Sequence, residues 1–258
     1  MGGFGFDFRG KKAIVLGIAD EKSIAYAIAK KLSDSGCKVA IGYQERNKEA
    51  IKPLLKKFKS PISEIYEATD DASVEGFFKM VEKEWKTVDY VVHSIAFAKK
   101  EHLRGRSIDI DRKGFLVAHD VSVFSFVDMI KKAEPLMKKG GSCVTMTFLG
   151  AEKAFPNYNV MGVAKAALES AVRYAAADVG KQSIRVNAIS AGPLPTAAAS
   201  AIKGFDELYF DYVHKSPLKK AITQEEVANA ALFLLSDLSS GITGEVLHVD
   251  AGYHIIGA

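Results

Sequence analysis

Residues 13–33 decide the fold, and they read AIVLGIADEKSIAYAIAKKLS. The segment begins with a short apolar run, passes through a turn that starts at Gly17, and continues with apolar residues at helical spacing. A short apolar run that leads into a helical pattern is typical of a buried strand followed by a helix. We therefore expect a strand at 13–16 and a helix at 24–33.

The same alternation continues to the end of the chain. The further expected strands are 38–43, 62–67, 90–94, 142–148, 185–190 and 246–250. The further expected helices are 73–85, 112–137, 159–179 and 224–235. The strands are apolar with no alternation, which is typical of a parallel sheet covered by helices. The sequence predicts an α/β fold, a single-domain, Rossmann-type, doubly wound parallel sheet of seven strands with helices on both faces.

Length and composition agree with one domain over residues 1–258. The chain has 48% hydrophobic and 26% charged residues, which excludes a mainly disordered protein. Two segments, 97–109 and 193–216, fit neither pattern, and both follow strands at the carboxyl edge of the sheet, where open α/β folds bind ligands. We expect 193–216 to be a substrate-binding loop, with a short helix that can hinge over the substrate.

Charged residues and cysteines exclude several classes of protein. Lys and Arg number 35 against 31 Asp and Glu, an excess spread along the chain, so we expect no nucleic-acid partner. No apolar run approaches the roughly 18 residues of a membrane span, so we expect no membrane attachment and a cytoplasmic location. Cys37 and Cys143 are interpreted as reduced core residues. The six histidines are scattered, so we expect no metal site and interpret His93 and His119 as structural.

The turn after the first expected strand suits a phosphate group. A helix N-terminus presents unpaired N–H groups and the positive end of its dipole, which stabilise a pyrophosphate. Ser23 can cap the helix and offer its hydroxyl to a phosphate. The strict G-x-G-x-x-G pattern is absent, since only Gly17 is present, and an ordinary turn with a serine cap is the alternative. The order of strand, turn, helix and second strand favours a dinucleotide.

The end of the second expected strand bears on the choice of dinucleotide. Gln44 and Glu45 lie where a side chain would face the adenosine ribose, and both can accept hydrogen bonds from hydroxyl groups. A carboxylate there repels a 2′-phosphate, whereas Arg46 and Lys48 would attract one. We expect NAD as the cofactor, with NADH preferred over NADPH.

Tyr158 and Lys165 are the expected catalytic residues. They are seven positions apart in a segment that opens a helix, so we expect them on one face, about 10.5 Å apart along the axis. A free tyrosine has a pKa near about 10, and a nearby ammonium group helps its hydroxyl to donate toward an oxyanion. Lys165 can supply this field and also hold ribose hydroxyl groups.

Further motifs accompany this pair. They are Gly17-x5-Ser23-Ile24-Ala25, His93-Ser94-Ile95, Pro156-Asn157-Tyr158-Asn159-Val160-Met161-Gly162, Arg185-Val186-Asn187-Ala188 and Ser190-Ala191-Gly192-Pro193. Together they resemble the enoyl-acyl-carrier-protein reductases of fatty acid synthesis, which belong to the short-chain dehydrogenase/reductase superfamily. The likeness extends from about residue 8 to about residue 253. It implies NADH-dependent reduction of the trans-2,3 double bond of an enoyl thioester on an acyl-carrier protein, the last reductive step of type II fatty acid elongation.

The resemblance also implies which residues bind the cofactor and the substrate. The positions that match cofactor-binding residues are Gly17, Ser23, Ile24, Gln44, Glu67, Ala68, Ser94, Ile95, Lys165, Leu194, Pro195 and Thr196. The positions that match the wall of the acyl pocket are Phe97, Ala98, Phe148, Met161, Ile202 and Phe205. Without the family, each apolar position could equally be an ordinary core residue.

Two partners follow from the resemblance. The family forms homotetramers, and segment 112–137 carries apolar residues on more than one face, so we expect a homotetramer. The acyl-carrier protein carries the substrate. The loop 97–109 is basic and suits an acidic carrier, with a solvated charged loop as the alternative.

Four positions depart from the family's pattern. Phe148 stands where many relatives have a second tyrosine, and Ala96 stands where glycine is usual. Pro195 replaces a basic residue, and Ala251 replaces the first glycine of an Asp-Gly-Gly sequence. The first two departures leave an inactive NAD-binding paralogue as one alternative.

A dehydrogenase of ketones or alcohols is another alternative. It would have a lysine four positions after the catalytic tyrosine, and Gly162 stands there. Tyr26 and Lys30 have that spacing, but they lie on the first expected helix, where we expect an ordinary pair.

Overall fold

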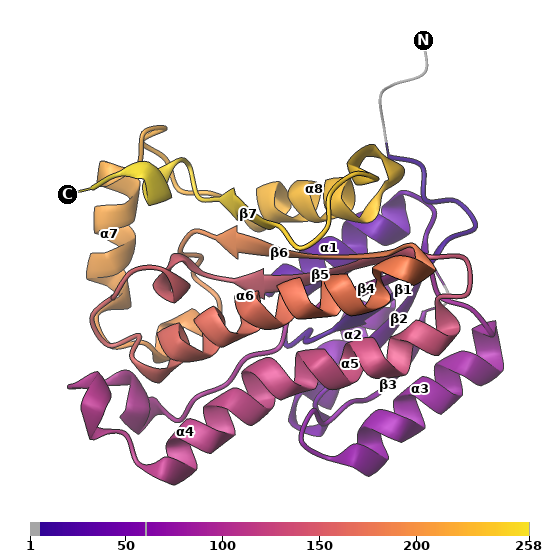
Figure 1. Cartoon of the computed structure of the whole chain (residues 1–258), viewed down its shortest axis with the longest axis horizontal. Helices are drawn as coiled ribbons and strands as arrows, with labels where there is room; N and C mark the ends of the chain where they lie inside the picture. The colour runs from indigo at the N-terminus through magenta and orange to yellow at the C-terminus, as the bar shows by residue number, and fades with distance from the viewer. Residues whose placement is uncertain (1–5, 60, 258) are drawn as a thin grey trace.

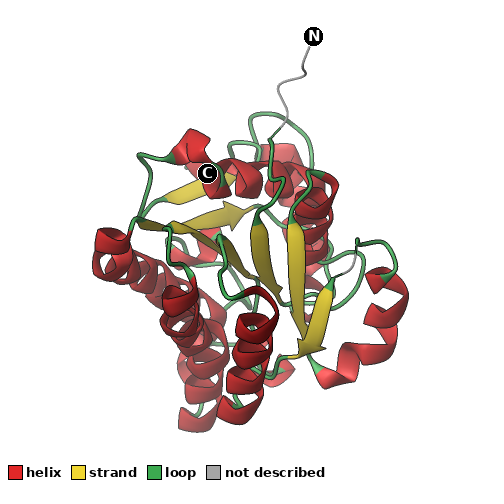
Figure 2. Cartoon of the chain, turned by 90° about the vertical axis from the view of Figure 1, so that its right-hand side faces the viewer, coloured by secondary structure: helices red, strands yellow, loops and turns green. Residues whose placement is uncertain are grey.

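Seven strands form one parallel sheet in the order β3-β2-β1-β4-β5-β6-β7. The computed structural model describes residues 6–59 and 61–257, and Figures 1 and 2 show the sheet between layers of helices. The strands are β1 (Lys12–Leu16), β2 (Lys38–Tyr43), β3 (Ile62–Ile65), β4 (Tyr90–His93), β5 (Gly141–Thr147), β6 (Ile184–Ala191) and β7 (Val246–Val249). Strand β1 pairs with β2 on one side and with β4 on the other. The predicted doubly wound fold is therefore confirmed.

Helices cover both faces of the sheet. In Figure 1, α4 and α5 follow each other end to end in front of the sheet with α6 alongside them, whereas α1 and α8 pack against each other on the opposite face. The α-helices are α1 (Ile24–Asp34), α2 (Lys48–Leu55), α3 (Asp71–Trp85), α4 (Arg112–His119), α5 (Ser125–Ala133), α6 (Val160–Val179), α7 (Phe205–Lys215) and α8 (Gln224–Leu235).

Two hydrophobic cores result from this arrangement, because successive side chains of a strand point to opposite faces. In β1, Ala13 and Val15 belong to the core shared with α1 and α8. Ile14 and Leu16 belong to the core shared with α3, α5 and α6. All four side chains are fully buried, and burial of a large aliphatic side chain contributes about 1.5–3 kcal/mol, so β1 anchors both layers.

Side-chain caps fix where two of the crossover helices begin. The Asp70 carboxylate accepts hydrogen bonds from the N–H groups of Ala72 and Ser73 at the start of α3. Thr223 and Glu226 form a reciprocal capping box at the start of α8. Such caps satisfy N–H groups that have no partner within the helix, and each contributes about 1 kcal/mol.

The expected elements are present, with ends that differ by a few residues. The main difference lies in 112–137, which is divided into α4 and α5 by a π-helical turn at Asp120–Phe124. Helix α7 was not predicted, and for α2 only an exposed helical face at 52–59 was expected. Helix α2 contains Pro53, which breaks a helical pattern in sequence, and α7 buries only Tyr212 completely, so its apolar pattern is weak.

Both segments without a sequence assignment leave the carboxyl ends of strands. The segment 97–109 follows β4 and contains two short 3-10 turns, Lys100–Leu103 and Ser107–Asp109. The segment 193–216 follows β6; its expected short helix is a 3-10 turn at Ala199–Ala201, after which α7 begins. Parallel strands end at one edge, so both segments lie beside the turn after β1.

Two further findings concern the described part of the chain. No helix in it is long and apolar enough to cross a membrane. Cys37 and Cys143 are buried and unpaired, and burial raises the pKa of each thiol to about 12. Both thiols are therefore inert core groups, as the sequence predicts.

Candidate functional site

The residues expected to bind the cofactor follow the carboxyl ends of five strands. Four of these strands, β3, β2, β1 and β4, are adjacent in the sheet, and β6 is separated from β4 only by β5. Because all strands are parallel, the residues that follow them lie along one edge of the sheet. Gly17, Ser23 and Ile24 follow β1, Gln44 follows β2, Glu67 and Ala68 follow β3, Ser94 and Ile95 follow β4, and Leu194, Pro195 and Thr196 follow β6.

Gly17 allows a close approach between the ends of β1 and β4. Its φ is 99°, and a Cβ atom at this position would collide with the backbone carbonyl of Ser94. The same Cβ would lie 3.3 Å from Cγ1 of Ile95. Only glycine combines this backbone angle with this contact, so Gly17 lets the turn before α1 pack directly against the backbone at the end of β4.

Ser23 is the N-cap residue of α1, but its hydroxyl does not cap the helix. It donates to the carbonyl oxygen of Asp20 at 2.6 Å, within the turn. The expectation that the Ser23 side chain caps α1 is therefore wrong, because the turn uses that hydroxyl. The first N–H groups of α1 keep no side-chain partner from Ser23, which suits an anionic ligand at this helix end.

Gln44 and Glu67 join the ends of β2 and β3. The Gln44 Nε2 group donates to Glu67 Oε2 at 3.2 Å, and the backbone N–H of Glu45 donates to Glu67 Oε1 at 2.9 Å. Arg46 in turn donates to Gln44 Oε1 at 2.6 Å. The Glu67 carboxylate is thus fixed beside Gln44 and Glu45, the residues expected to face the adenosine ribose, and Arg46 uses one of its five N–H groups on Gln44.

The three residues after β6 differ in their exposure. Leu194 is buried in the core shared with α1 and α8, so its side chain is occupied by packing. Pro195 is exposed, and the Thr196 hydroxyl accepts a hydrogen bond from the Ala199 N–H at 3.3 Å. The hydroxyl thereby starts the 3-10 turn at Ala199–Ala201.

Tyr158 lies just before α6 and not on it. The N-cap residue is Asn159, whose φ of 44° and ψ of −120° break the helix between the two catalytic candidates. The prediction that Tyr158 and Lys165 lie on one helix is therefore wrong, and the spacing of about 10.5 Å derived from helix geometry does not apply across Asn159. Asn159 is held in this conformation by bonds from its Nδ2 group to backbone carbonyls of the 97–109 segment, those of His102 and Arg104 at 3.3 Å.

Lys165 is buried on the sheet-facing side of α6, beneath the end of β5. Its Nζ donates to the carbonyl oxygen of Met146 at 2.8 Å. Burial lowers the pKa of Lys165 to about 8, and the Glu169 carboxylate opposes that shift. Burial also raises the pKa of Tyr158, so the phenol remains a proton donor at neutral pH.

An apolar cluster encloses the Tyr158 ring. The Phe148 ring meets it edge to face, with centroids 4.9 Å apart and planes at 69°. Four of the expected pocket residues belong to this cluster, namely Ala98, Phe148, Met161 and Ile202, together with Leu103 and Phe155. A phenol in such surroundings faces a medium of low polarity, which strengthens its hydrogen bond to a developing charge.

Two expected pocket residues lie outside this cluster. Phe97 is 39% exposed, and its backbone N–H donates to the Ser122 hydroxyl at 3.1 Å. Phe205 begins α7 and lines a neighbouring cleft of about 610 Å³. Residues that share the cleft include Asn157, Pro195, Thr196 and Ile202. Ile202 therefore lies between the cleft and the cluster around Tyr158.

His93 is fully buried and both its ring nitrogens are occupied. Nε2 lies 2.9 Å from the Ser125 hydroxyl, which itself donates to the Val121 carbonyl at 2.7 Å. Because the single Ser125 proton is used there, Nε2 carries the imidazole proton, and Nδ1 accepts from the Thr145 hydroxyl at 2.9 Å. Burial lowers the pKa of His93 to about 3, so it is a neutral structural group, as the sequence predicts.

Tyr26 and Lys30 make separate contacts, as expected of an ordinary helical pair. The Tyr26 ring packs against Phe58, with centroids 5.9 Å apart, and Lys30 forms an ion pair with Asp34. In the described ranges, no three His, Cys, Asp or Glu side chains gather as metal ligands.

Sequence reasoning missed three groups around Tyr158 and Lys165. A Cβ atom at Gly150 would collide with the Tyr158 ring, so this glycine makes room for the phenol. Glu169 and Thr147 share a hydrogen bond of 2.7 Å beside Lys165. Glu169 follows Lys165 by four positions on α6, a spacing that places both on one helix face and is visible in the sequence.

The comparisons with known proteins agree on one family. A family model described as enoyl-(acyl carrier protein) reductase matches residues 17–254. An enoyl-[acyl-carrier-protein] reductase [NADH] of Rhizobium meliloti is 47% identical over 249 residues, which cover 96% of this chain and 92% of the relative. An NADPH-dependent enoyl-[acyl-carrier-protein] reductase of Staphylococcus aureus is 45% identical, with coverage of 95% and 97%.

A solved structure is similar throughout. The enoyl-(acyl-carrier-protein) reductase of Anaplasma phagocytophilum, crystallised in complex with NAD, superposes with a TM-score of 0.95. It is 45% identical in sequence, and the match covers 98% of this chain and 97% of that chain.

Proposed function

This chain belongs to the enoyl-(acyl carrier protein) reductase family, and from this premise we propose how its own residues carry out the reaction. The protein is an oxidoreductase that uses NADH to reduce the trans-2,3 double bond of enoyl-acyl-carrier-protein thioesters in fatty acid biosynthesis. One observation carries the proposal, namely that Tyr158 and Lys165 both lie beside the carboxyl edge of the sheet. Tyr158 belongs to the apolar cluster, and Lys165 is bonded to the Met146 carbonyl near the end of β5.

The edge of the sheet fits a dinucleotide. Gly17 lets the turn after β1 lie directly against the end of β4, and the N-terminus of α1 that follows is suited to the pyrophosphate. Gln44 would face the adenosine ribose, and Glu67 and Ala68 would lie near the adenine. Ser94, Ile95 and Thr196 would contact the nicotinamide half. Bound NADH supplies the hydride for the β-carbon of the thioester, and negative charge then develops on the thioester carbonyl oxygen.

Tyr158 donates a hydrogen bond to that carbonyl oxygen. Its raised pKa keeps the phenol protonated, and the apolar cluster strengthens the bond as charge develops. Lys165 uses one of its three N–H groups on Met146, which leaves two for the ribose hydroxyls of the cofactor. Phe148, which cannot donate a hydrogen bond, packs edge to face against the Tyr158 ring.

The polar group at β2 and β3 explains a preference for NADH. The Glu67 carboxylate is fixed by Gln44 and by the Glu45 N–H, and a 2′-phosphate brought to it would be repelled. Arg46, one candidate for pairing with that phosphate, donates to Gln44 through Nη2, so its charge and its remaining N–H groups make the preference for NADH a moderate one.

NADH oxidation with medium-chain trans-2-enoyl thioesters tests this function. We expect rapid loss of NADH with enoyl thioesters and none with acetoacetyl thioesters, and faster turnover with NADH than with NADPH. In Tyr158→Phe, kcat falls by about 10²- to 10³-fold while NADH binding is retained, because only the donor to the developing charge is removed. Tyr26→Phe is the matched control, since it removes a buried tyrosine hydroxyl on α1. Binding of NADH without turnover of any enoyl thioester would overturn the proposal.

A homotetramer accounts for an apolar surface on the front helices. Exposed apolar side chains recur on α4, α5, α6 and the π-helical turn: Phe115, Leu116, Phe124, Val127, Val163 and Tyr174. A surface of this kind on neighbouring helices is typical of a subunit interface. Light scattering of the wild type is expected to give a molar mass four times that of one chain. The double variant Leu116→Lys with Val163→Lys is expected to give a smaller molar mass than the wild type. A wild-type mass of one chain would contradict it.

Three further assignments complete the proposal. Residues 1–258 act as one catalytic domain with the substrate loop at 193–216, since one core includes residues from Phe8 to Ala251.

The basic loop 97–109 receives the acidic carrier protein. Added salt is therefore expected to raise KM for the carrier-bound substrate more than KM for a coenzyme A thioester. The cytoplasm is its place of action, because two unpaired cysteines suit a reducing compartment; fractionation of the native cells checks this.

A further inference from the structure

Two side chains of α6, those of Lys165 and Glu169, form hydrogen bonds to consecutive residues at the end of β5. Lys165 Nζ donates to the Met146 carbonyl at 2.8 Å. One helical turn later, Glu169 Oε1 accepts from the Thr147 hydroxyl at 2.7 Å. Both bonds lie in the buried interior, so they fix α6 against the strand whose end leads into the pocket.

We propose that Glu169, together with Thr147, is a positioning residue for Lys165: it holds the strand end whose Met146 carbonyl binds the ammonium group, and its carboxylate favours the charged form of that group. This inference rests on the proposed function, because it assigns Lys165 to the cofactor. Glu169 acts through Lys165 and touches neither cofactor nor substrate.

The charge of Glu169 is suited to this role. A buried ammonium group tends to lose its proton, and the Glu169 carboxylate favours the charged form of Lys165. His93 also faces Lys165, but it is neutral and bonded to Thr145, so it supplies no compensating negative charge. Tyr158 is protonated as well, which leaves Glu169 as the carboxylate that acts on Lys165.

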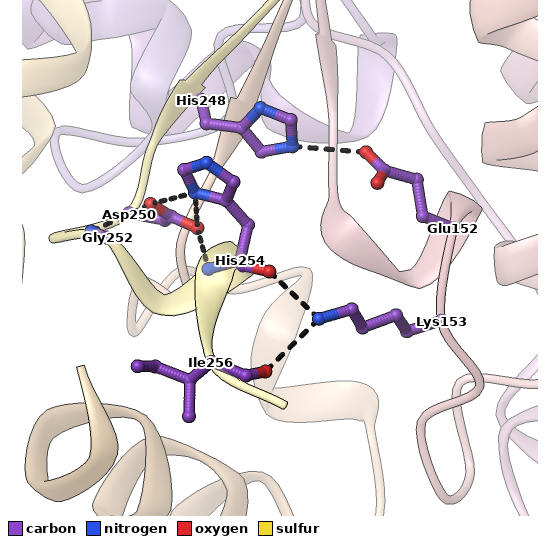
Figure 3. A network of polar contacts seen from close by, with 7 residues as sticks. All are labelled: Glu152, Lys153, His248, Asp250, Gly252, His254 and Ile256. Atoms are coloured by element: carbon purple, nitrogen blue, oxygen red, sulfur yellow. Dashed lines mark hydrogen bonds and ion pairs between the residues drawn. The ribbon is translucent and has the colours of Figure 1, made fainter. Parts of the chain in front are cut away.

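Glu169 itself faces several charged groups. Burial raises its pKa, whereas the Thr147 hydroxyl lowers it. Arg173 on α6 and His248 on β7 also lower it, and Glu152 raises it. Figure 3 shows that His248 is paired with Glu152, at 3.1 Å between Nε2 and Oε1. Burial has the largest effect on the pKa of Glu169, and the Thr147 hydroxyl is the strongest of the neighbours that lower this pKa.

Three variants separate the charge from the hydrogen bond. Glu169→Gln removes the charge and can still accept from Thr147. Thr147→Val removes the bond and favours a neutral Glu169, whereas Thr147→Ser restores the bond. Asp178→Asn is the matched control, because Asp178 is an exposed carboxylate on the same helix.

The experiment measures kcat/KM for NADH and the dissociation constant of NADH across the pH range that contains the Lys165 pKa. In the wild type both worsen as pH rises through about 8, because Lys165 loses its proton. In Glu169→Gln the pH at which kcat/KM and NADH affinity decline is lower by about one unit, and Thr147→Val lowers this pH as well. Thr147→Ser and Asp178→Asn coincide with the wild type.

Coincident pH profiles of Glu169→Gln and the wild type would overturn the inference. If Glu169→Gln does not fold, the Thr147→Val and Thr147→Ser pair decides the question in the same way, and equal profiles there would overturn it. A wild type that binds NADH but reduces no enoyl thioester would refute the proposed function alone, because the NADH binding profiles still test Glu169.

Discussion

Asn157 and Asn159 both have positive φ angles, 64° and 44°, and enclose Tyr158 between them. Asn157 Nδ2 donates to the Lys203 carbonyl at 3.0 Å, in the 193–216 segment. Asn159 Nδ2 donates to carbonyls of the 97–109 segment, including Gly105 at 3.4 Å. The tyrosine is thereby tied to both segments that form its pocket.

Replacing Asn159 separates backbone strain from this attachment. Asn159→Ala loses the bonds and keeps an unfavourable φ, so we expect a loss of about 1–3 kcal/mol in unfolding free energy. Asn159→Gly loses the same bonds without the strain and is expected to be more stable than Asn159→Ala. Both lower kcat/KM for the enoyl thioester, by about tenfold, since Tyr158 is less well held. Urea unfolding and steady-state kinetics check this; full activity in Asn159→Gly would show that the attachment is irrelevant.

Gly150→Ala is expected to displace the Tyr158 ring, because its new methyl group would occupy the space of that ring. We expect kcat to fall by about tenfold or more while the dissociation constant of NADH stays unchanged. Gly180→Ala, at the end of α6, is the control, since a Cβ there meets no atom within 4 Å. An unchanged kcat in Gly150→Ala would mean that the ring can move at no cost.

Stability is expected to fall in acid because of His93. Folded His93 has a pKa of about 3, whereas the unfolded chain titrates it near about 6.5. Below the higher value the unfolded state binds a proton that the folded state does not. The contribution of His93 is therefore complete above pH about 6.5 and is lost toward pH about 3, by up to about 1.4 kcal/mol per pH unit. Urea unfolding at several pH values measures the slope, which is expected to be shallower in His93→Gln; equal slopes would contradict it.

Ala251 has a φ of 55°, at a position where the family's pattern has glycine. An alanine in the left-handed region is strained, so Ala251→Gly is expected to raise the unfolding free energy by up to about 1 kcal/mol. Ala50→Gly, on the exposed side of α2, is expected to lower the unfolding free energy by about 1 kcal/mol. Thermal unfolding of both variants decides this, and a destabilised Ala251→Gly would be the contrary result.

The fold was predictable because the strands are apolar on both faces and the helices are not. In β1, four successive buried residues face two different cores, and only a sheet covered on both sides produces that pattern. The gathering of Gly17, Gln44 and Glu67 was also predictable, because the carboxyl ends of parallel strands share one edge.

The surroundings of Tyr158 were not predictable in the same way. The φ of Asn159 is held by carbonyl groups more than 50 positions away in the chain, such as that of Arg104, with a separation of 55. No local pattern reports such a bond. The same holds for Thr147 and Glu169, 22 positions apart, although the helical spacing of Glu169 from Lys165 was visible.

The π-helical turn at Asp120–Phe124 is equivalent to one inserted residue in a continuous helix. Ser122 within the turn contacts Phe97, and Ser125 directly after the turn contacts His93, so the turn sets the register between α5 and the 97–109 segment. Deleting one residue there would turn α4 by about 100° relative to α5. In a sequence alignment, a relative with a regular helix here would have a gap of one residue. Such a gap would indicate that the segment 97–109 packs differently against α5 in that relative.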